Sequence, residues 1–364
     1  MIKILFCGSS WRTGLTSLCT KQACAISTQS RGSILCVTGE GEQSPGLTEL
    51  LKKNDVPHEV INGFDVRRQL WRLVCRFRAV TCAFSPNVVH VQTNWQLLIA
   101  ILARFGGERR YRIVYTVHGF RNNQPLKAIF ARVAILALLA AGADLVIVPT
   151  SYVRRKFALL GKKLWRSMLG VDEAFFQPQA PVEATGGRKR LIFAGQFRRG
   201  KNQDVVIRAL SHYCRKTGDF DVELELPGQG ELLSNCKQMV TDLGLEDNVR
   251  FPGLLDREQM LSAYQRSQCA IVPTNSETFG HCIAEPFVLG RIVISRPVGC
   301  ATDIIVHGEN GFLFQSESDL TDLLVKILRD LPQWSHVGRR AYEERAQFHW
   351  KTITAEYLEV LKTI

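Results

Sequence analysis

The chain has 364 residues, of which 46% are apolar and 22% are charged. This length and composition predict two folded domains, each with its own core, and they exclude a peptide or a disordered tail. The longest uncharged apolar stretch, residues 133–143, is too short to cross a bilayer, so we expect no transmembrane helix.

The positive charge is concentrated in the first half of the chain. Residues 1–180 contain 24 Lys and Arg against 10 Asp and Glu, a net charge of +14, whereas residues 181–364 carry −2. This asymmetry predicts an anionic partner for the first half, such as a membrane leaflet, an acidic saccharide or nucleic acid. The alternative is a basic surface that serves only solubility.

Cysteine usage and the N-terminus both predict a cytoplasmic protein. The cysteine count of 11 is odd, no pair has C-x-x-C spacing, and several cysteines lie in apolar runs, which favours reduced core residues. Residues 1–8 lack the features of a signal peptide and are typical of a first buried strand.

Short apolar or β-branched runs alternate with longer segments of helical periodicity. The expected strands are residues 2–7, 34–37, 88–91, 113–117, 145–148, 191–194, 222–226, 249–251, 269–272 and 292–294. This alternation predicts two doubly wound α/β domains. We expect an N-terminal domain at 1–175, a linker rich in Pro and Gly at 176–190, a second domain at 191–345, and a C-terminal helix within 346–364 that packs back on the first domain.

The loop after the first strand contains a single glycine, Gly14, between Gly8 and the next helix. It does not match G-x-G-x-x-G, which disfavours a nicotinamide-dependent enzyme. Farther along, His118 follows a buried strand, where a lone histidine is more often structural than catalytic.

Two groups of basic residues in the first half are interleaved with apolar ones. The first comprises Arg67, Arg68, Arg72, Arg76 and Arg78 with Leu70, Trp71, Leu73, Val74 and Phe77. The second comprises Arg154, Arg155, Lys156, Lys162, Lys163 and Arg166 with Phe157, Leu164 and Trp165. This pattern predicts binding to an anionic membrane surface. The alternative is that the apolar residues are core positions beneath a solvated basic face.

The second domain opens with a strand that runs into a cationic loop containing Arg198, Arg199 and Lys201. A diphosphate leaving group gains negative charge as its bond breaks, and cations of this kind stabilise that charge. Lys201 is the leading candidate, and the choice between Arg198 and Arg199 stays open. The alternative is a solvated basic turn.

The most informative stretch is residues 273–285. After a buried strand the chain turns at 276–280 and begins a helix, so backbone N–H groups near Phe279 and Gly280 are expected to form an anion site. Glycine at 280 permits close approach of a phosphate or sugar. Glu277 and Glu285 could hold hydroxyl groups on either side of it.

With this stretch and the segments around it, the sequence resembles the retaining glycosyltransferases of family 4, which have the GT-B fold, and the resemblance covers nearly the whole chain. Glu277 and Glu285 match the E-x7-E element of that family. The other matching segments are residues 115–119, 148–151, 169–172, 228–230, 250–253, 290–300 and 308–313. The resemblance implies two Rossmann-like doubly wound domains facing across a cleft.

The resemblance also implies roles for individual residues. Glu285 is expected on the ribose, Glu277 with the Phe279 and Gly280 amides on the sugar and phosphates, and Lys201 with Arg198 or Arg199 on the diphosphate. Gly228 and Gly14 are expected near the donor, and His118 in the cleft as a catalytic residue together with Glu277 and Lys201. The loop departs from the family at Gln196 and Asn202, where an arginine and a glycine are usual.

The resemblance therefore implies a retaining hexosyltransferase that requires no cofactor. We expect it to be metal-independent, because the sequence contains no Asp-x-Asp motif or His/Asp cluster, and to be cytoplasmic, either free or peripheral on the inner face of the cell membrane. Its donor is a sugar nucleotide, and its acceptor is a saccharide or a lipid-linked saccharide of surface polysaccharide or lipopolysaccharide synthesis. A sugar-nucleotide epimerase or a phosphorylase of the same fold is the alternative. A nucleic-acid-binding protein is more remote, because the basic residues form no recognised binding motif and we expect no nucleic-acid partner.

Overall fold

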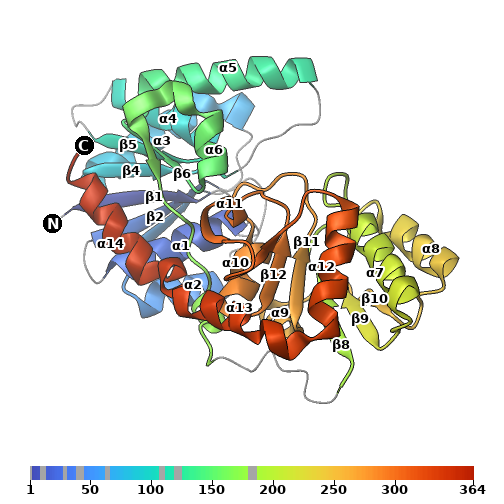
Figure 1. Cartoon of the computed structure of the whole chain (residues 1–364). Helices are drawn as coiled ribbons and strands as arrows, with labels where there is room; N and C mark the ends of the chain where they lie inside the picture. The colour runs from blue at the N-terminus through green and yellow to red at the C-terminus, as the bar shows by residue number, and fades with distance from the viewer. Residues whose placement is uncertain are drawn as a thin grey trace. The chain divides into compact units, whose positions relative to one another are not determined.

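The computed structural model describes two α/β units (Figure 1). The first unit comprises residues 1–170 and 350–364, and the second comprises residues 171–349. The described residues are 2–8, 14–27, 31–37, 45–61, 66–105, 111–118, 125–178 and 187–364. Each unit is built on a parallel sheet, which confirms the predicted fold class.

The first unit contains a seven-stranded parallel sheet in the order β3-β2-β1-β4-β5-β6-β7. Every residue of β4 and β6 is buried, as expected for strands covered by helices on both faces. The strands are β1 (Lys3–Gly8), β2 (Arg31–Val37), β3 (His58–Ile61), β4 (Val88–Val91), β5 (Arg112–Thr116), β6 (Leu145–Val148) and β7 (Leu164–Arg166).

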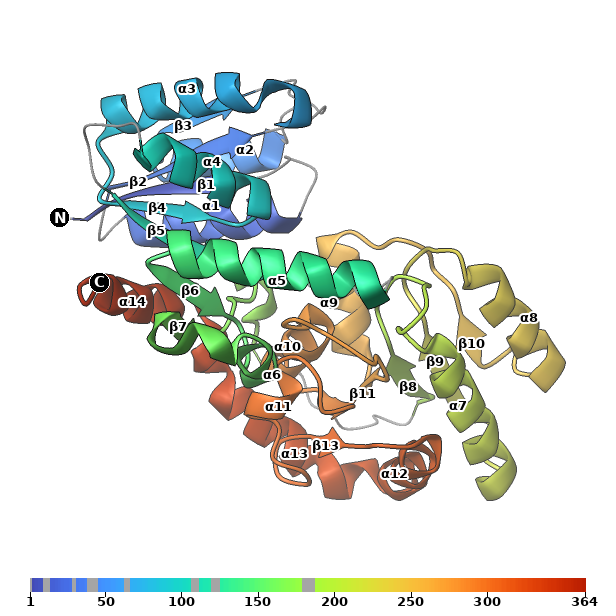
Figure 2. The same cartoon turned by 90° about the horizontal axis from the view of Figure 1, so that it is seen from above.

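Helices cover both faces of this sheet and define two cores (Figure 2). One core contains side chains of α3 (Val66–Phe84), α4 (Asn94–Phe105) and α5 (Pro125–Gly142). The other contains side chains of α1 (Gly14–Ser27), α2 (Pro45–Lys53) and α14 (Trp350–Leu361). The short helices α6 (Ser151–Lys156) and η1 (Ala158–Lys163) complete the unit. In the part of the chain that the structure describes, no helix is long and apolar enough to cross a membrane.

The last helix, α14, is part of the first unit although it follows the second in sequence. The Tyr357 hydroxyl lies 3.0 Å from Nδ1 of His90 on β4, and Nε2 of the same imidazole lies 2.7 Å from the Thr116 hydroxyl. The ring of Tyr357 also stacks on Trp165. These contacts join α14 to β4, β5 and β7.

The second unit contains a six-stranded parallel sheet in the order β10-β9-β8-β11-β12-β13. Its strands are β8 (Lys189–Ile192), β9 (Val222–Glu225), β10 (Val249–Arg250), β11 (Cys269–Val272), β12 (Ile292–Ser295) and β13 (Phe312–Leu313). Its helices are η2 (Glu173–Phe175), α7 (Gln203–Thr217), α8 (Leu233–Leu243), α9 (Arg257–Arg266), α10 (His281–Val288), α11 (Ala301–Ile304), α12 (Glu317–Arg329), α13 (Leu331–Glu343) and η3 (Glu344–Phe348).

The boundaries of the units differ from those expected. Residues 171–178, assigned from the sequence partly to the first domain and partly to the linker, pack in the second unit. The Val171 N–H donates to the Phe348 carbonyl at 3.0 Å, and the Phe176 ring lies edge-on to His349. Much of the rest of the expected linker, residues 179–186, lies outside the described residues.

Candidate functional site

The sheet of the second unit changes its direction of winding between β8 and β11. The chain leads from β8 to β9 and β10 on one side of the sheet, and from β11 to β12 and β13 on the other. Loops that leave the carboxyl ends of such strands turn to opposite sides, and ligands bind in the crevice between them. The loops 193–202 and 273–280 flank this point, and they contain Arg198, Arg199, Lys201, Glu277, Phe279 and Gly280.

The two loops are joined by an ion pair and by a shared side-chain amide. Nζ of Lys201 contacts Oε1 of Glu277, and the two side chains are only 12% and 16% exposed. The Asn202 amide donates to the carbonyl of Pro273 at 2.8 Å and to Oδ1 of Asn275 at 2.7 Å. A cation and a carboxylate 76 positions apart in sequence therefore lie together at the carboxyl edge of the sheet.

The departure from the family at Asn202 has a backbone explanation. Asn202 has a φ of +59°, in the left-handed region, immediately before α7. Glycine adopts this conformation without steric cost, and asparagine is one of the few other residues that tolerate it. The substitution therefore preserves the turn and adds the amide that joins the loops.

The N-terminus of α10 begins at a glycine with a φ of +96°, Gly280. A Cβ atom there would lie 2.8 Å from Cδ1 of Ile283 and 3.5 Å from Cγ of Glu277, so the backbone approaches both side chains closely. The Ile283 N–H of the first turn donates to the Gly280 carbonyl at 2.9 Å. This end of the helix lies close to Glu277 of the Lys201–Glu277 pair, and its positive dipole favours an anionic oxygen there.

Phe279 anchors this turn instead of lining an open surface. Its side chain is buried, and its ring packs edge-on against Phe348. Its carbonyl accepts a hydrogen bond from the Cys300 N–H at 2.7 Å. The backbone amide of Phe279, and not its ring, is thus the part suited to the role expected from the sequence.

Glu277 and Glu285 lie in different surroundings despite their common motif. Glu277 is in the loop and pairs with Lys201, whereas Glu285 is on α10, near Tyr264 of α9. Burial, followed by the nearby carboxylate of Glu285, raises the pKa of Tyr264 well above its ordinary value. Two separate roles for the two carboxylates are therefore compatible with the structure.

Gly228 lies where the loops after β8 and β9 touch. Its φ is +143°, and a Cβ atom there would lie 2.0 Å from the carbonyl oxygen of Gly195. The Gly195 N–H donates to the Pro227 carbonyl at 3.0 Å, so the loops pack backbone against backbone. The packing of the two loops thus requires a glycine at position 228, independently of any contact with a nucleotide.

Arg198 and Arg199 are both exposed on the loop, and the choice between them stays open. Arg296, which follows β12 at the same edge, was not among the site residues expected from the sequence. Its guanidinium donates to Oδ1 of Asn275 at 3.2 Å and lies over the Phe314 ring. The signal that identifies it is a basic residue directly after a buried strand of the same sheet.

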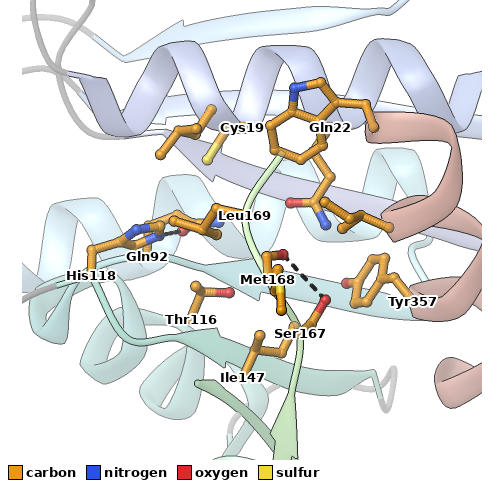
Figure 3. Close-up of a pocket in the computed structure, with 13 residues that line it drawn as sticks. Cys19, Gln22, Gln92, Thr116, His118, Ile147, Ser167, Met168, Leu169 and Tyr357 are labelled. Carbon is orange, nitrogen blue, oxygen red and sulfur yellow. Dashed lines mark hydrogen bonds between the residues drawn. The ribbon is translucent and has the colours of Figure 1, made fainter. Parts of the chain in front are cut away.

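The remaining candidates, His118 and Gly14, lie in the first unit. His118 follows β5, and its Nε2 is hydrogen-bonded to Oε1 of Gln92, which follows β4. Both line a small pocket together with residues of α1 and α14 (Figure 3). Gly14 is the first residue of α1, and the loop between Gly8 and Gly14 lies outside the described residues.

Some of the basic residues expected to meet a membrane make hydrogen bonds within the first unit instead. Arg78 donates to the carbonyls of Leu102 and Ala103 at the end of α4, and Lys163 donates to the carbonyls of Ala140 and Ala143 at the end of α5. The apolar residues Leu73, Val74, Phe77 and Phe157 are core positions. Trp71 is 68% exposed, and Arg72 and Arg76 of the same helix are also exposed.

Within the described ranges, no group of three or more His, Cys, Asp or Glu residues is arranged to hold a metal ion. The charged groups at the carboxyl edge of the second sheet are instead the Lys201–Glu277 pair with Arg198, Arg199 and Arg296.

Two family models match different halves of the chain. The model described as "Glycosyl transferases group 1" matches residues 177–344, and "Glycosyltransferase Family 4" matches residues 34–171. A D-inositol 3-phosphate glycosyltransferase of Corynebacterium diphtheriae is 28% identical over 47% of this chain and 41% of that protein. The chain thus spans half or less of the length of such inositol phosphate relatives.

A longer match is to an alpha-monoglucosyldiacylglycerol synthase of Streptococcus pneumoniae, 22% identical over 84% of this chain and 74% of that protein. Among solved structures, Anabaena Alr3699/HepE in complex with UDP and glucose has a TM-score of 0.80 at 20% identity, with both chains covered completely. The lipopolysaccharide outer core galactosyltransferase WaaB in its apo form has a TM-score of 0.75 at 13% identity, covering 100% of this chain and 99% of that one.

Proposed function

This chain has the GT-B fold of the group 1 and family 4 glycosyltransferases, and from that premise we propose that it transfers a sugar from a nucleoside diphosphate to an acceptor hydroxyl. The observation that carries the proposal is the meeting of Lys201 and Glu277 beside the N-terminus of α10 at the switch point of the second sheet. Cations and helix N–H groups at one point stabilise a departing diphosphate.

The proposed roles follow this geometry. Lys201, with Arg198 or Arg199, neutralises the diphosphate, and the Phe279 and Gly280 amides bind the phosphates and the sugar. Glu277 holds the transferred sugar, and Glu285 holds the ribose. Uridine diphosphate is the first nucleotide to test, because solved structures of the same fold contain UDP and glucose.

We propose retention of configuration, on the strength of the resemblance carried by Glu277 and Glu285. The acceptor hydroxyl then attacks from the face that the diphosphate leaves, and the diphosphate assists its deprotonation. Because cationic side chains and a helix terminus supply the positive charge, we propose that no metal is needed. Activity should therefore survive EDTA, and an enzyme silenced by EDTA and restored by magnesium or manganese would contradict this mechanism.

We assign the acceptor to the first unit and propose that it is a saccharide or a lipid-linked saccharide. The exposed Trp71 with Arg72 and Arg76 on α3 suits an anionic lipid surface. The Streptococcus pneumoniae relative is named for a glucosylated diacylglycerol, and WaaB for lipopolysaccharide. Synthesis of a surface polysaccharide or lipopolysaccharide at the inner face of the membrane fits this acceptor.

The experiment that tests the proposed function is a thermal-shift titration with uridine, guanosine, adenosine and thymidine diphosphates. A nucleotide at 100 times its Kd stabilises the folded state by about 2.7 kcal/mol, so one of the four should raise Tm with its concentration. Transfer from the corresponding sugar nucleotide is then followed by release of the diphosphate, and the anomer of the product is read by NMR.

Two variants show whether the effect arises at the assigned site. Lys201→Ala should abolish the shift in Tm. Lys216→Ala is the matched control, because Lys216 also pairs with an acid, Asp322 at 2.9 Å, but lies at the opposite end of α7. No shift with any nucleotide would refute the function, and an unchanged shift in Lys201→Ala would refute the assignment of Lys201.

A further inference from the structure

The hydrogen bond between Gln92 and His118 ties a buried amide to the proposed catalytic histidine. Gln92 is 5% exposed and follows β4, and its Oε1 lies against Nε2 of His118 beyond β5. Figure 3 shows the two side chains on one side of the pocket, joined by this bond. An amide oxygen is an acceptor only, so the imidazole nitrogen that meets it carries the proton.

Gln92 is itself held by a second buried glutamine. Oε1 of Gln96 accepts the N–H groups of Gln92 and Thr93 at 2.9 and 3.1 Å. The Gln96 amide in turn donates to the carbonyl of Gly8 at 2.6 Å. The position of Gln92 is thus fixed to β1, and His118 is fixed through it.

We propose that Gln92 is a positioning residue that holds His118 as the neutral Nε2–H tautomer. This inference rests on the proposed function, in which His118 is a catalytic residue. A neutral amide orients the ring without favouring its charged form, whereas a carboxylate at the same place would raise its pKa by about 1 to 3 units.

The described residues that line the pocket around His118 carry little charge. The other titratable residues lining the pocket are Cys19 of α1 and Tyr357 of α14, and His90 lies nearby on β4. Burial raises the pKa of Tyr357 well above its ordinary value, and burial followed by His118 lowers that of His90 to about 3. Among the described lining residues there is no acid, lysine or arginine. Among the described lining residues, Gln92 is the one that is hydrogen-bonded to Nε2 of His118.

The test compares Gln92→Glu with Gln92→Leu. An imidazole whose pKa rises from about 6.5 to about 8 keeps only about a tenth of its neutral form at pH 7. Gln92→Glu should therefore lower kcat about tenfold at pH 7 and recover at pH 9, with KM for the sugar nucleotide little changed. Gln92→Leu removes the acceptor without adding charge, so its loss of kcat should persist at both pH values.

The second measurement is the NMR titration of His118 in the intact protein labelled with ¹⁵N-histidine, with His118→Gln used for assignment. The wild type should show the Nε2–H tautomer, and Gln92→Glu should shift the titration upward by at least one pH unit. Gln22→Glu is the control, because Gln22 lines the same pocket but lies across it from His118 in Figure 3. Its effect on the titration should be much smaller.

The outcomes separate this inference from the proposed function. A titration of His118 that is unchanged in Gln92→Glu, or one that shifts while the pH profile of kcat does not, would overturn the positioning role. Absence of sugar-nucleotide turnover in the wild type would overturn the proposed function instead, and the NMR titration would still decide whether Gln92 controls the protonation of His118.

Discussion

Lys201 and Glu277 illustrate how one residue pair can serve both folding and binding. With both side chains largely buried, each charge compensates the other, and removal of one would leave a buried charge without its partner. Under the proposed function, a bound diphosphate would offer Lys201 a second anion, and the carboxylate of Glu277 would then be available to accept hydrogen bonds from a sugar.

The two glutamates should separate in their kinetic effects. Glu285→Ala should weaken binding of the nucleoside diphosphate, and Glu277→Ala should mainly lower kcat. Each effect should be about 10- to 100-fold, because that factor corresponds to the free energy of one hydrogen bond to a charged group. Calorimetric titration measures the first effect and steady-state kinetics the second. Near-wild-type activity in both variants would contradict the assignment.

His90 should make the first unit sensitive to acid. Its pKa is lowered to about 3 by burial, so the unfolded chain, with an ordinary value near 6.5, binds the extra proton between these limits. Stability should therefore fall as pH decreases from about 6.5 towards 3, by about 1.4 kcal/mol per pH unit. Urea unfolding at pH 7, 6 and 5 measures this slope.

His90→Asn should flatten the slope, and the exposed His212→Asn should not. Equal slopes in His90→Asn and the wild type would show that the buried imidazole does not determine the acid response.

At the scale of the elements, the loops after β8 and β9 pack so closely that a side chain at Gly228 would not fit between them. Gly228→Ala should destabilise the second unit by at least 1 to 3 kcal/mol, because its Cβ would meet the Gly195 carbonyl in a disfavoured backbone conformation. Gly218→Ala, at a positive φ of 70° but in open space, should cost only about 1 kcal/mol. Chemical denaturation compares the two, and equal costs would mean that the loop relaxes.

The central strands could be predicted from the sequence, whereas three of the four edge strands could not. The fourth edge strand, β10 (Val249–Arg250), lies within the expected residues 249–251. β4, β6 and β11 span the expected residues because full burial on both faces requires a continuous apolar run. β3, β7 and β13 were not expected. They lie at the edges of their sheets and contain only two to four residues, which is too short for a clear strand pattern in the sequence.

The site could be predicted only as separate pieces. The cationic loop and the Glu277–Gly280 turn each had a local signature, since a polar loop and a glycine followed a buried strand. Their pairing through Lys201 and Glu277, and the bond from Gln92 to His118, depend on strand order. No local pattern encodes that order, and Gln92 is an ordinary residue in sequence.

At the scale of the whole molecule, the excess charge of the first half predicts a lipid-dependent location. Each Lys or Arg near an anionic leaflet contributes about 1 kcal/mol, and the exposed Trp71 adds apolar contact. Co-sedimentation with vesicles should require anionic lipid and should fall as salt rises and the Debye length shrinks below about 10 Å.

Trp71→Ala should weaken this binding, whereas Phe220→Ala should not, because Phe220 is an exposed aromatic residue of the second unit. Binding that does not depend on lipid charge and salt, or the absence of binding, would contradict this prediction. An acidic soluble glycan would then be the expected partner of the basic first half.

Because α14 is the last helix of the chain but belongs to the first unit, it also determines which unit can finish folding first during translation. Tyr357, Leu358 and Leu361 belong to the same core as Ile4 and Phe6 of β1, yet the ribosome makes all of residues 171–349 between them. At about 5 to 20 residues per second this delay is roughly 10 to 40 s. The second unit is continuous in sequence and can fold during translation, while the first waits with one face of its sheet partly uncovered. The unit that begins first on the ribosome is therefore the one completed last, and its open face is the surface that a chaperone would meet.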